Sequence, residues 1–405
     1  MKKELDNVAS TERLDWTLFS VLVIGSQGLS AFLPGNPVNT SLALCSVIIG
    51  FWIVPKMADG LRLLFLNPMV LFLVAWSVGA ALLSSRQLVS LILNGSLILM
   101  IMYAGLCQKS TKITVLTFAA ATTASLVPSA VGYFSPLPTL RGAGTAAGYA
   151  GFFPWNSAAG ICAAAAILGL ALTYLVIGFK WWQLPSIAMA AMMLAVSKSA
   201  TALFTLTLAL AVMATQQIVR RVDRQRRPLV LITAAVVGFF LVPRIVDFLS
   251  GTSNLAKVAN RTESFSGRTQ IWEWALDGIS RSPYWGYGAG FWTSAIGWNN
   301  SAHNGFIDIA LNAGIPAFIA VCVIIVVSAA KHLFAQSILL PLLIFGVVTN
   351  LAFSLLGTPA VASMAIWLAV GANLRHTASR PSANGRAAYT GVVSSMPNRR
   401  IRNPM

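Results

Sequence analysis

One histidine of this chain stands where it could act as a general base. His303 follows Ala302 and precedes Asn304 at the end of a long polar segment, where the tenth apolar run begins. A helix start at that point disfavours the protonated ring because of the helix dipole, and a neutral imidazole can accept a proton. The other histidines, His332 and His376, lie in a predicted cytoplasmic turn and at the start of the tail. The alternative is that His303 only caps a helix at the membrane surface.

Two arginines close to one helix start could bind an anion. Arg261 and Arg268 stand close to the start of a predicted short helix, which is capped by Ser264 or Ser266 and closed before Pro283. Guanidinium groups match phosphate oxygens two at a time, and the N–H groups of a helix start add to such a site. A pyrophosphate would fit there. The alternative is that the two arginines form salt bridges with nearby carboxylates, namely Glu263, Glu273 or Asp277.

The segment that follows could bind sugars. Between residues 282 and 292 glycines alternate with five aromatic residues, which are Tyr284, Trp285, Tyr287, Phe291 and Trp292. Glycine allows tight turns, and flat aromatic rings can stack on the faces of sugars. The alternative is an aromatic belt at the level of the lipid headgroups.

Other kinds of chemistry have no counterpart in the sequence. There is no Asp-any-Asp pair, no Walker loop and no His-Glu-any-any-His pattern, so we predict neither a metal nor a cofactor. The four cysteines fall inside apolar runs and predict small buried hydrophobes. No pair of external carboxylates can be placed as the acid and base of a glycosidase. These carboxylates are Asp247, Glu263, Glu273, Asp277 and Asp308.

The composition requires these residues to be held by membrane helices. Of the 405 residues 57% are hydrophobic and 10% are charged, whereas a soluble domain carries roughly 25% charged residues. The net charge of +17 could suggest nucleic acid, but the basic residues are mostly scattered singly between apolar runs, which is typical of membrane topology. We therefore predict an all-α fold, a polytopic bundle of about twelve transmembrane helices with one long periplasmic loop that carries short helices.

The predicted spans follow from apolar runs that approach the length needed to cross a bilayer. They cover residues 16–33, 40–55, 63–83, 88–107, 113–133, 155–179, 184–196, 200–217, 228–243, 305–330, 336–356 and 358–374. Several are short or poorly separated, so the range is ten to thirteen spans.

Lysine and arginine set the orientation, because they are retained on the cytoplasmic side of membrane helices. With the N-terminus inside, 20 of the 28 basic residues fall in cytoplasmic segments. The other eight are Arg86, Arg141, Lys198, Arg244, Lys257, Arg261, Arg268 and Arg281. Both termini are therefore predicted to be cytoplasmic and the chemistry periplasmic.

The chain divides into four predicted parts. Residues 1–243 hold nine transmembrane helices, and residues 244–304 form the periplasmic loop with the candidate active site. Residues 305–374 hold three more helices. Residues 375–405, rich in Ser, Asn, Pro and Arg, predict a disordered basic cytoplasmic tail that can rest on anionic lipid.

Four short motifs follow one another in a specific order and spacing. They are Ser266-Gly267-Arg268-Thr269 with Trp272, Pro283 with Gly286-Tyr287-Gly288, Ala302-His303-Asn304-Gly305, and Asn312-Ala313-Gly314-Ile315-Pro316. Two earlier stretches agree, Arg141-Gly142 through Phe153-Pro154-Trp155-Asn156 and Ser197-Lys198-Ser199. In this arrangement residues 140–330 resemble bacterial O-antigen ligases and the related polymerases of O-antigen and exopolysaccharide. Three positions depart from the family pattern, which often has arginine at Lys198, glutamate at Asn312 and glycine at Ala317.

The resemblance implies inverting, metal-independent glycosyl transfer outside the cytoplasm, from an undecaprenyl-pyrophosphate-linked glycan to an acceptor sugar. It implies that His303 is the catalytic base and that Arg268, with Arg261 and Lys198 as weaker candidates, binds the pyrophosphate. Further candidates for substrate binding are Arg141, Trp272, Tyr287, Trp292 and Asn304.

The runs 267–272 and 286–292 are most similar to those of exopolysaccharide polymerases, which favours polymerisation of repeat units. A ligase that joins polymer to lipid A core shares both motifs and is the alternative. A third hypothesis is that the protein is a transporter or flippase. This hypothesis is disfavoured because the predicted spans carry almost no charged residues. Expected partners are the lipid-linked donor, a lipid-linked glycan or lipid A core acceptor, membrane lipids, and chain-length regulator and export proteins, but no nucleic acid.

Overall fold

The computed structural model describes part of the chain. The described residues are 67–84, 98–99, 101–102, 105–106, 111–134, 143–145, 148–151, 156–222, 268–288, 302, 304–352 and 361–378. The predicted spans 16–33, 40–55 and 228–243 and the predicted tail 375–405, apart from its first four residues, lie outside them. The predicted number of twelve spans therefore stays a prediction.

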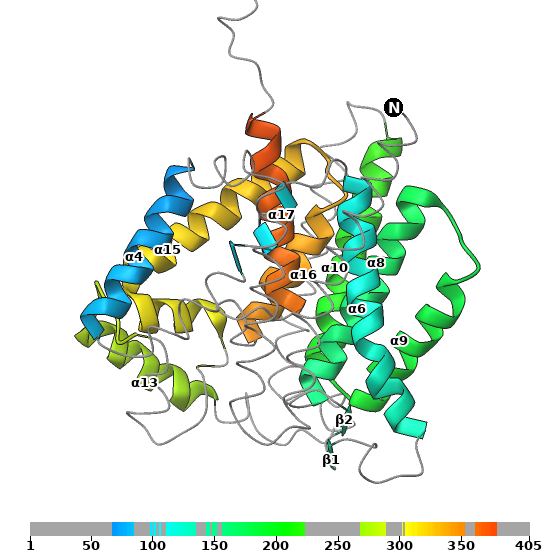
Figure 1. Cartoon of the computed structure of the whole chain (residues 1–405), viewed down its shortest axis with the longest axis horizontal. Helices are drawn as coiled ribbons and strands as arrows, with labels where there is room; N and C mark the ends of the chain where they lie inside the picture. The colour runs from blue at the N-terminus through cyan, green and yellow to red at the C-terminus, as the bar shows by residue number, and fades with distance from the viewer. Residues whose placement is uncertain are drawn as a thin grey trace, which may run out of the picture.

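The described chain is mostly helical (Figure 1). Its elements are α4 (Pro68–Ser84), α6 (Thr111–Phe134), β1 (Ala143–Thr145), β2 (Gly148–Gly151), α8 (Asn156–Ile177), α9 (Gln183–Ser197), α10 (Ala200–Arg221), α13 (Arg268–Arg281), α15 (Gly305–Phe334), α16 (Leu340–Ala352) and α17 (Val361–Ala378). Among the described residues four helices, α6, α8, α10 and α15, are long and apolar enough to cross a membrane. The chain is an integral membrane protein, as predicted.

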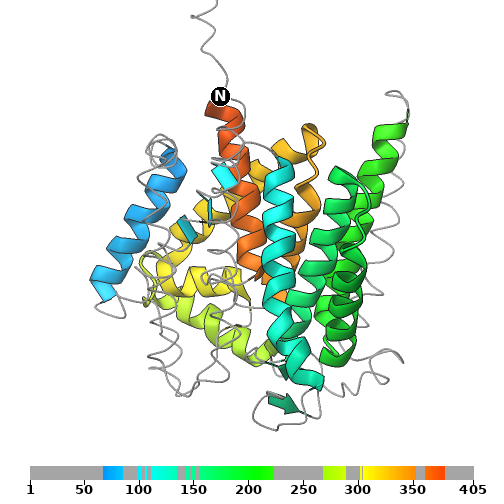
Figure 2. The ribbon, with the colours of Figure 1, turned by 45° about the vertical axis from the view of Figure 1, so that its right-hand side comes forward.

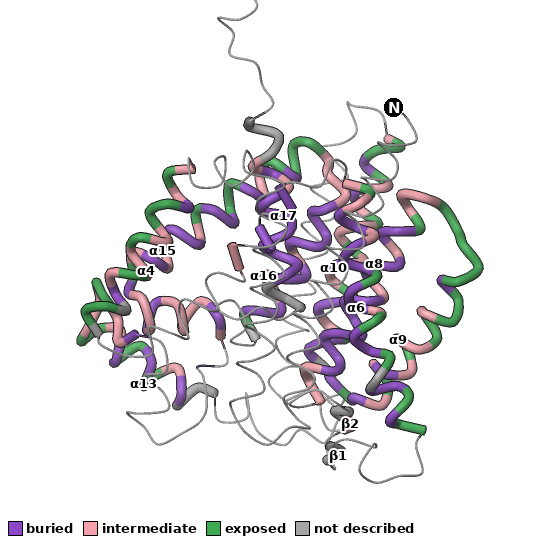
Figure 3. Tube along the Cα trace, viewed as in Figure 1, coloured by how far each residue is buried: buried purple, intermediate pink, exposed green. Residues whose placement is uncertain are grey.

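Helix α8 is central to a bundle with α6, α9 and α10 (Figure 2). Its residues 159–166 are all buried, and most are alanine or glycine (Figure 3). Small side chains allow membrane helices to approach closely. A Cβ added to Gly169 would lie 2.9 Å from the Cα of Ala119 on α6, and one on Gly160 would lie 2.5 Å from the Cβ of Ser199. The bundle is therefore held by close backbone packing.

A two-stranded antiparallel hairpin, β1 and β2, adds to the predicted all-α fold. It pairs Thr145 with Gly148, and the Tyr149 hydroxyl donates to the Ser129 carbonyl of α6 at 3.0 Å. The hairpin lies at the lower end of the molecule in Figure 1, where α6 ends and α8 begins. The sequence did not predict it because two short, glycine-containing strands give no alternating pattern.

Helix α15 is broken, which corrects the prediction of one span over 305–330. Gly314 has φ 81° and ψ 171°, outside the helical region, and Pro316 follows it. The two parts of α15 run in clearly different directions in Figure 1, one beside α13 and the other beside α4. The first part, 305–313, spans only about 14 Å at 1.5 Å per residue and is too short to cross a bilayer.

The opposite end of α15 is fixed to two other helices. His332 is buried in its last turn, and its Nε2 donates to the Ala369 carbonyl of α17 at 2.9 Å. Gln216 and Arg220 of α10 donate to backbone carbonyls of the turn that leads to α16. His332 therefore has a structural role inside a helix, whereas the sequence predicted a turn.

Candidate functional site

Helix α13 confirms the short helix predicted close to Arg261 and Arg268. It begins at Arg268 and ends at Arg281, before Pro283. Ile271, Ala275 and Gly278 are spaced one turn apart and form its buried face. A Cβ on Gly278 would lie 2.9 Å from Cδ1 of Leu311, so α13 packs directly on the first part of α15. The structure describes the backbone of Arg268 but not its side chain. Three predicted residues lie outside the described residues altogether: Arg261 and the caps Ser264 and Ser266.

Residues 282–288 cap the break in α15. The interruption at Gly314 leaves three consecutive carbonyls, those of Leu311, Asn312 and Ala313, at the end of a helical segment. The N–H groups of Tyr287 and Gly288 donate to the first two, each at 2.9 Å. The indole Nε1 of Trp76 on α4 donates to the third at 3.0 Å. Each of these three carbonyls therefore has a donor from another segment.

The same segment supports the start of the second part of α15. The N–H of Ile315 donates to the Pro283 carbonyl at 2.7 Å. Two glycines make this approach possible, because both have positive φ and neither has room for a side chain. A Cβ on Gly314 would lie 1.9 Å from the Tyr284 carbonyl oxygen, and one on Gly286 would lie 2.6 Å from the Leu311 carbonyl oxygen.

These contacts join α13, residues 282–288, 302 and 304, and the first part of α15 through Pro316 into what we call the α13–α15 unit. Tyr287, predicted to bind substrate, is half-buried and packs in this unit with Ile271, Ala275 and Leu311. Its backbone N–H also caps α15, so its described contacts are structural. Trp292, another predicted substrate residue, lies outside the described residues.

The residues on both sides of His303 are held by side chains. Ala302 is fully buried; its N–H donates to Oδ1 of Asp308 at 2.9 Å, and its carbonyl accepts from Nε1 of Trp272 at 2.8 Å. Asn304 caps α15 through Oδ1, which accepts from two backbone N–H groups at 3.0 and 3.2 Å. His303 itself lies outside the described residues.

Trp272 and Asn304 were predicted as substrate-binding residues; in the structure Trp272 bonds to Ala302, and Asn304 caps α15. The sequence analysis did not predict the hydrogen bond between Asp308 and Ala302 and counted Asp308 only among five external carboxylates. An acidic residue in the first turns after an asparagine cap was the available signal. Trp76 gave no signal, because its partner is 237 residues away.

Lys198 lies in the turn between α9 and α10. It confirms the predicted turn between two helices: it ends α9 in the left-handed conformation, with φ 50°, and the next residue, Ser199, caps α10. Asn156 Nδ2 donates to the Ser197 carbonyl at 2.9 Å, which joins this turn to the start of α8. The Lys198 side chain is exposed. Arg141 lies outside the described residues.

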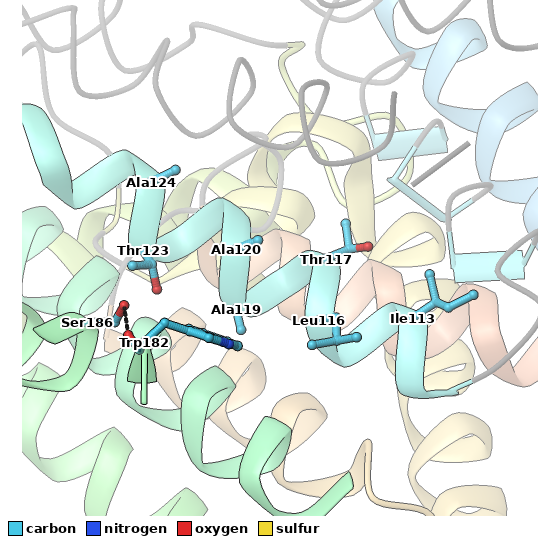
Figure 4. A pocket seen from close by; sticks show the side chains of 9 residues that line it. All are labelled: Ile113, Leu116, Thr117, Ala119, Ala120, Thr123, Ala124, Trp182 and Ser186. Carbon is cyan, nitrogen blue, oxygen red and sulfur yellow. Dashed lines mark hydrogen bonds between the residues drawn. The ribbon is translucent and has the colours of Figure 1, made fainter. Parts of the chain in front are cut away.

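An apolar cavity of about 430 Å³ lies between α6 and the start of α9 (Figure 4). Alanines and threonines of α6 line it together with Trp182 and Ser186, and the Ser186 hydroxyl donates to the Trp182 carbonyl at 3.1 Å. None of the predicted site residues lines this cavity. Among the described residues no three metal-binding side chains come together.

A family comparison identifies the segment that contains these features. Residues 184–322 match the family model described as O-antigen ligase. This segment is therefore similar to the O-antigen ligase domain. It begins in α9, ends in the second part of α15, and contains every predicted site residue except Arg141. The resemblance predicted over 140–330 is thus confirmed for this range. No curated protein matches the chain.

The matched segment 184–322 includes both the Lys198 turn and the whole α13–α15 unit. Trp76, which contacts this unit, lies outside the matched segment. The match and the four long apolar helices together support an integral membrane protein of the inner membrane. Four sequence motifs that are separate along the chain therefore correspond to one folded unit, in which Pro283, Gly286 and Gly314 make the backbone contacts.

Proposed function

We propose that the protein transfers a glycan from an undecaprenyl-pyrophosphate carrier to an acceptor sugar on the periplasmic face of the inner membrane. The observation that carries the proposal is the O-antigen ligase family match over residues 184–322, which contains the α13–α15 unit. Within that unit Ala302, directly before His303, bonds to Trp272 of α13, whose first residue is Arg268, and Asn304, directly after His303, caps α15.

In the proposed reaction His303 takes the proton of the attacking hydroxyl. The acceptor oxygen forms a bond to the anomeric carbon while the bond from that carbon to the pyrophosphate breaks, which inverts the configuration. The undecaprenyl pyrophosphate leaves with the bonding electrons. Arg268, with Arg261 and Lys198, offsets the negative charge that develops on this leaving group, and the N–H groups at the start of α13 add to the effect. Neither a metal nor a cofactor is required.

The favoured reaction is polymerisation of lipid-linked repeat units of an exopolysaccharide or O-antigen, because the runs 267–272 and 286–292 are most similar to those of polymerases. Transfer of polymer to lipid A core is the second candidate, since the family model is described as O-antigen ligase. The two differ only in the acceptor. Arg141, Trp292 and the ring faces of Trp272 and Tyr287 are candidates for sugar contacts.

Purified protein in lipid nanodiscs tests the proposal directly. Incubation with an undecaprenyl-pyrophosphate oligosaccharide should give longer lipid-linked glycan, and a ligase would instead require lipid A core in the assay. Arg268→Lys keeps the charge but loses the planar fork, and should lower turnover about ten- to a hundredfold, with Arg268→Ala lower still. Wild-type turnover in a correctly folded Arg268→Ala would remove this arginine from the site.

The orientation is a separate part of the proposal. Reporter fusions near Asn254 and Asn299 should report the periplasm, and fusions after Arg227 and Arg375 should report the cytoplasm. A cytoplasmic signal at Asn254 would place the long loop inside the cell and overturn the assignment of the site.

A further inference from the structure

The segment before the proposed base is held in an unusual way. Ala302 is fully buried, and its N–H and its carbonyl both bond to side chains, those of Asp308 and Trp272. A buried backbone group needs a partner, and in regular structure that partner is another backbone group. Here two side chains from different helices supply both partners, which fixes the peptide groups on either side of Ala302.

We propose that Asp308 and Trp272 are positioning residues for transfer, which hold the backbone that carries His303. This inference rests on the proposed function, because it requires His303 to act as the base. Asn304 fixes the other neighbour of His303 by capping α15. The two neighbours of His303 can therefore shift only if one of these side-chain bonds breaks.

Trp272 also connects the base to the leaving-group side of the site. It lies four residues after Arg268 on α13, so both residues stand on the same face of that helix. Its indole N–H reaches the carbonyl of Ala302, the residue directly before His303. The Trp272 bond thus sets the distance between α13 and the carbonyl of Ala302. Proton removal and leaving-group binding depend on that distance, because a misplacement of about 1 Å can cost about a hundredfold in rate.

Asp308 serves this purpose through an oxygen that accepts a hydrogen bond. Asparagine has an oxygen at the same position, whereas alanine has none, so the two substitutions separate the hydrogen bond from the charge. Asp308→Ala should lower kcat about ten- to a hundredfold with little change in KM, and Asp308→Asn should stay within about threefold of wild type. Trp272→Phe keeps the packed ring but loses the N–H, and should lower kcat about tenfold.

Matched controls come from the exposed face of α13. Asp277→Ala removes an exposed carboxylate whose partner is Arg281, and Trp274→Phe changes an exposed tryptophan of the same helix. Both should keep wild-type turnover. Melting temperature and membrane abundance of every variant show whether it is folded, and the milder Asp308→Asn and Trp272→Phe keep the test informative if Asp308→Ala does not fold.

The deciding experiment repeats Asp308→Ala in the His303→Ala background. A residue that acts only through His303 adds no further loss when His303 is already gone, so the two effects should not multiply. A further loss of the same size would show that Asp308 acts independently of His303. Failure of Asp308→Asn to restore turnover would show that the carboxylate itself is required. Either result overturns the inference and leaves the proposed function standing, whereas full turnover in His303→Ala alone overturns the proposed base.

Discussion

The bundle of α6, α8, α9 and α10 and the α13–α15 unit satisfy their backbones in different ways. In the bundle regular helices bond within themselves, and small residues such as Gly169 let them pack closely. In the α13–α15 unit a broken helix depends on donors from a loop and from α4. Irregular backbone at membrane depth is tolerated only where protein or a water-filled cavity meets it. We therefore expect function to depend on the irregular α13–α15 unit more than on the regular bundle.

The largest effect should come from a substitution at the break. Gly314→Ala places a Cβ 1.9 Å from the Tyr284 carbonyl oxygen at φ 81°, so strain and collision add. We expect a loss of about 2 to 6 kcal/mol in stability and no measurable transfer. Melting temperature and monodispersity in detergent measure the first, and nanodisc turnover measures the second.

Gly178→Ala is the matched control, because Gly178 has φ 77° but no atom within 4 Å of an added Cβ. Only strain applies there, about 1 to 2 kcal/mol. Equal destabilisation by the two variants would mean that the break is not locked by residues 282–288.

A second pair of glycine substitutions, one in the α13–α15 unit and one in the bundle, compares how much each region contributes to turnover. Gly286→Ala, whose Cβ would lie 2.6 Å from the Leu311 carbonyl oxygen, should lower turnover per folded molecule about tenfold or more. Gly169→Ala, whose Cβ would lie 2.9 Å from the Ala119 Cα, should lower stability by about 1 to 3 kcal/mol with normal turnover per folded molecule. The reverse pattern would place the functional region in the bundle.

A smaller effect is expected from Trp76→Phe. It removes the donor to the Ala313 carbonyl but keeps a ring against Trp285, where the two tryptophans now stack with centroids 4.4 Å apart. A fully buried unsatisfied carbonyl costs about 1 to 3 kcal/mol; the Ala313 carbonyl is only partly buried, so the loss should lie at the lower end of this range and appear as a lower melting temperature. Trp181→Phe at a position that is 79% exposed is the control and should change stability by less than about 0.5 kcal/mol. Equal changes in melting temperature for the two variants would show that the hydrogen bond from Trp76 of α4 does not stabilise the break in α15.

Much of the helical fold could be predicted from the sequence, because long apolar runs have few alternatives in a membrane. The predicted runs 113–133 and 155–179 differ by only a few residues from α6 and α8. The helix at α13 was also predictable, since apolar residues one turn apart end before a proline. The break in α15 was missed because residues 305–330 are mostly apolar, although a glycine two residues before Pro316 was a local signal.

The candidate site was predictable as a set of motifs but not as an arrangement. The order of the motifs indicated the family, yet their spacing did not show that Gly286 must meet Leu311 or that Trp272 must reach Ala302. These contacts join residues 25 and 30 positions apart, and the Trp76 contact spans 237. Hydrogen bonds to backbone carbonyls at such separations leave no periodic pattern in the sequence.

The turnover of His303→Ala in lipid nanodiscs, with an undecaprenyl-pyrophosphate oligosaccharide as donor, tests most directly whether His303 is the base of glycan transfer. The variant should melt like the wild type and transfer glycan at about a hundredth of its rate or less, because a general base contributes about 10² to 10⁴. His303→Gln should not rescue transfer, since glutamine can imitate one hydrogen bond of imidazole but does not carry a proton. A folded His303→Ala that retains more than about half of wild-type turnover would contradict the account.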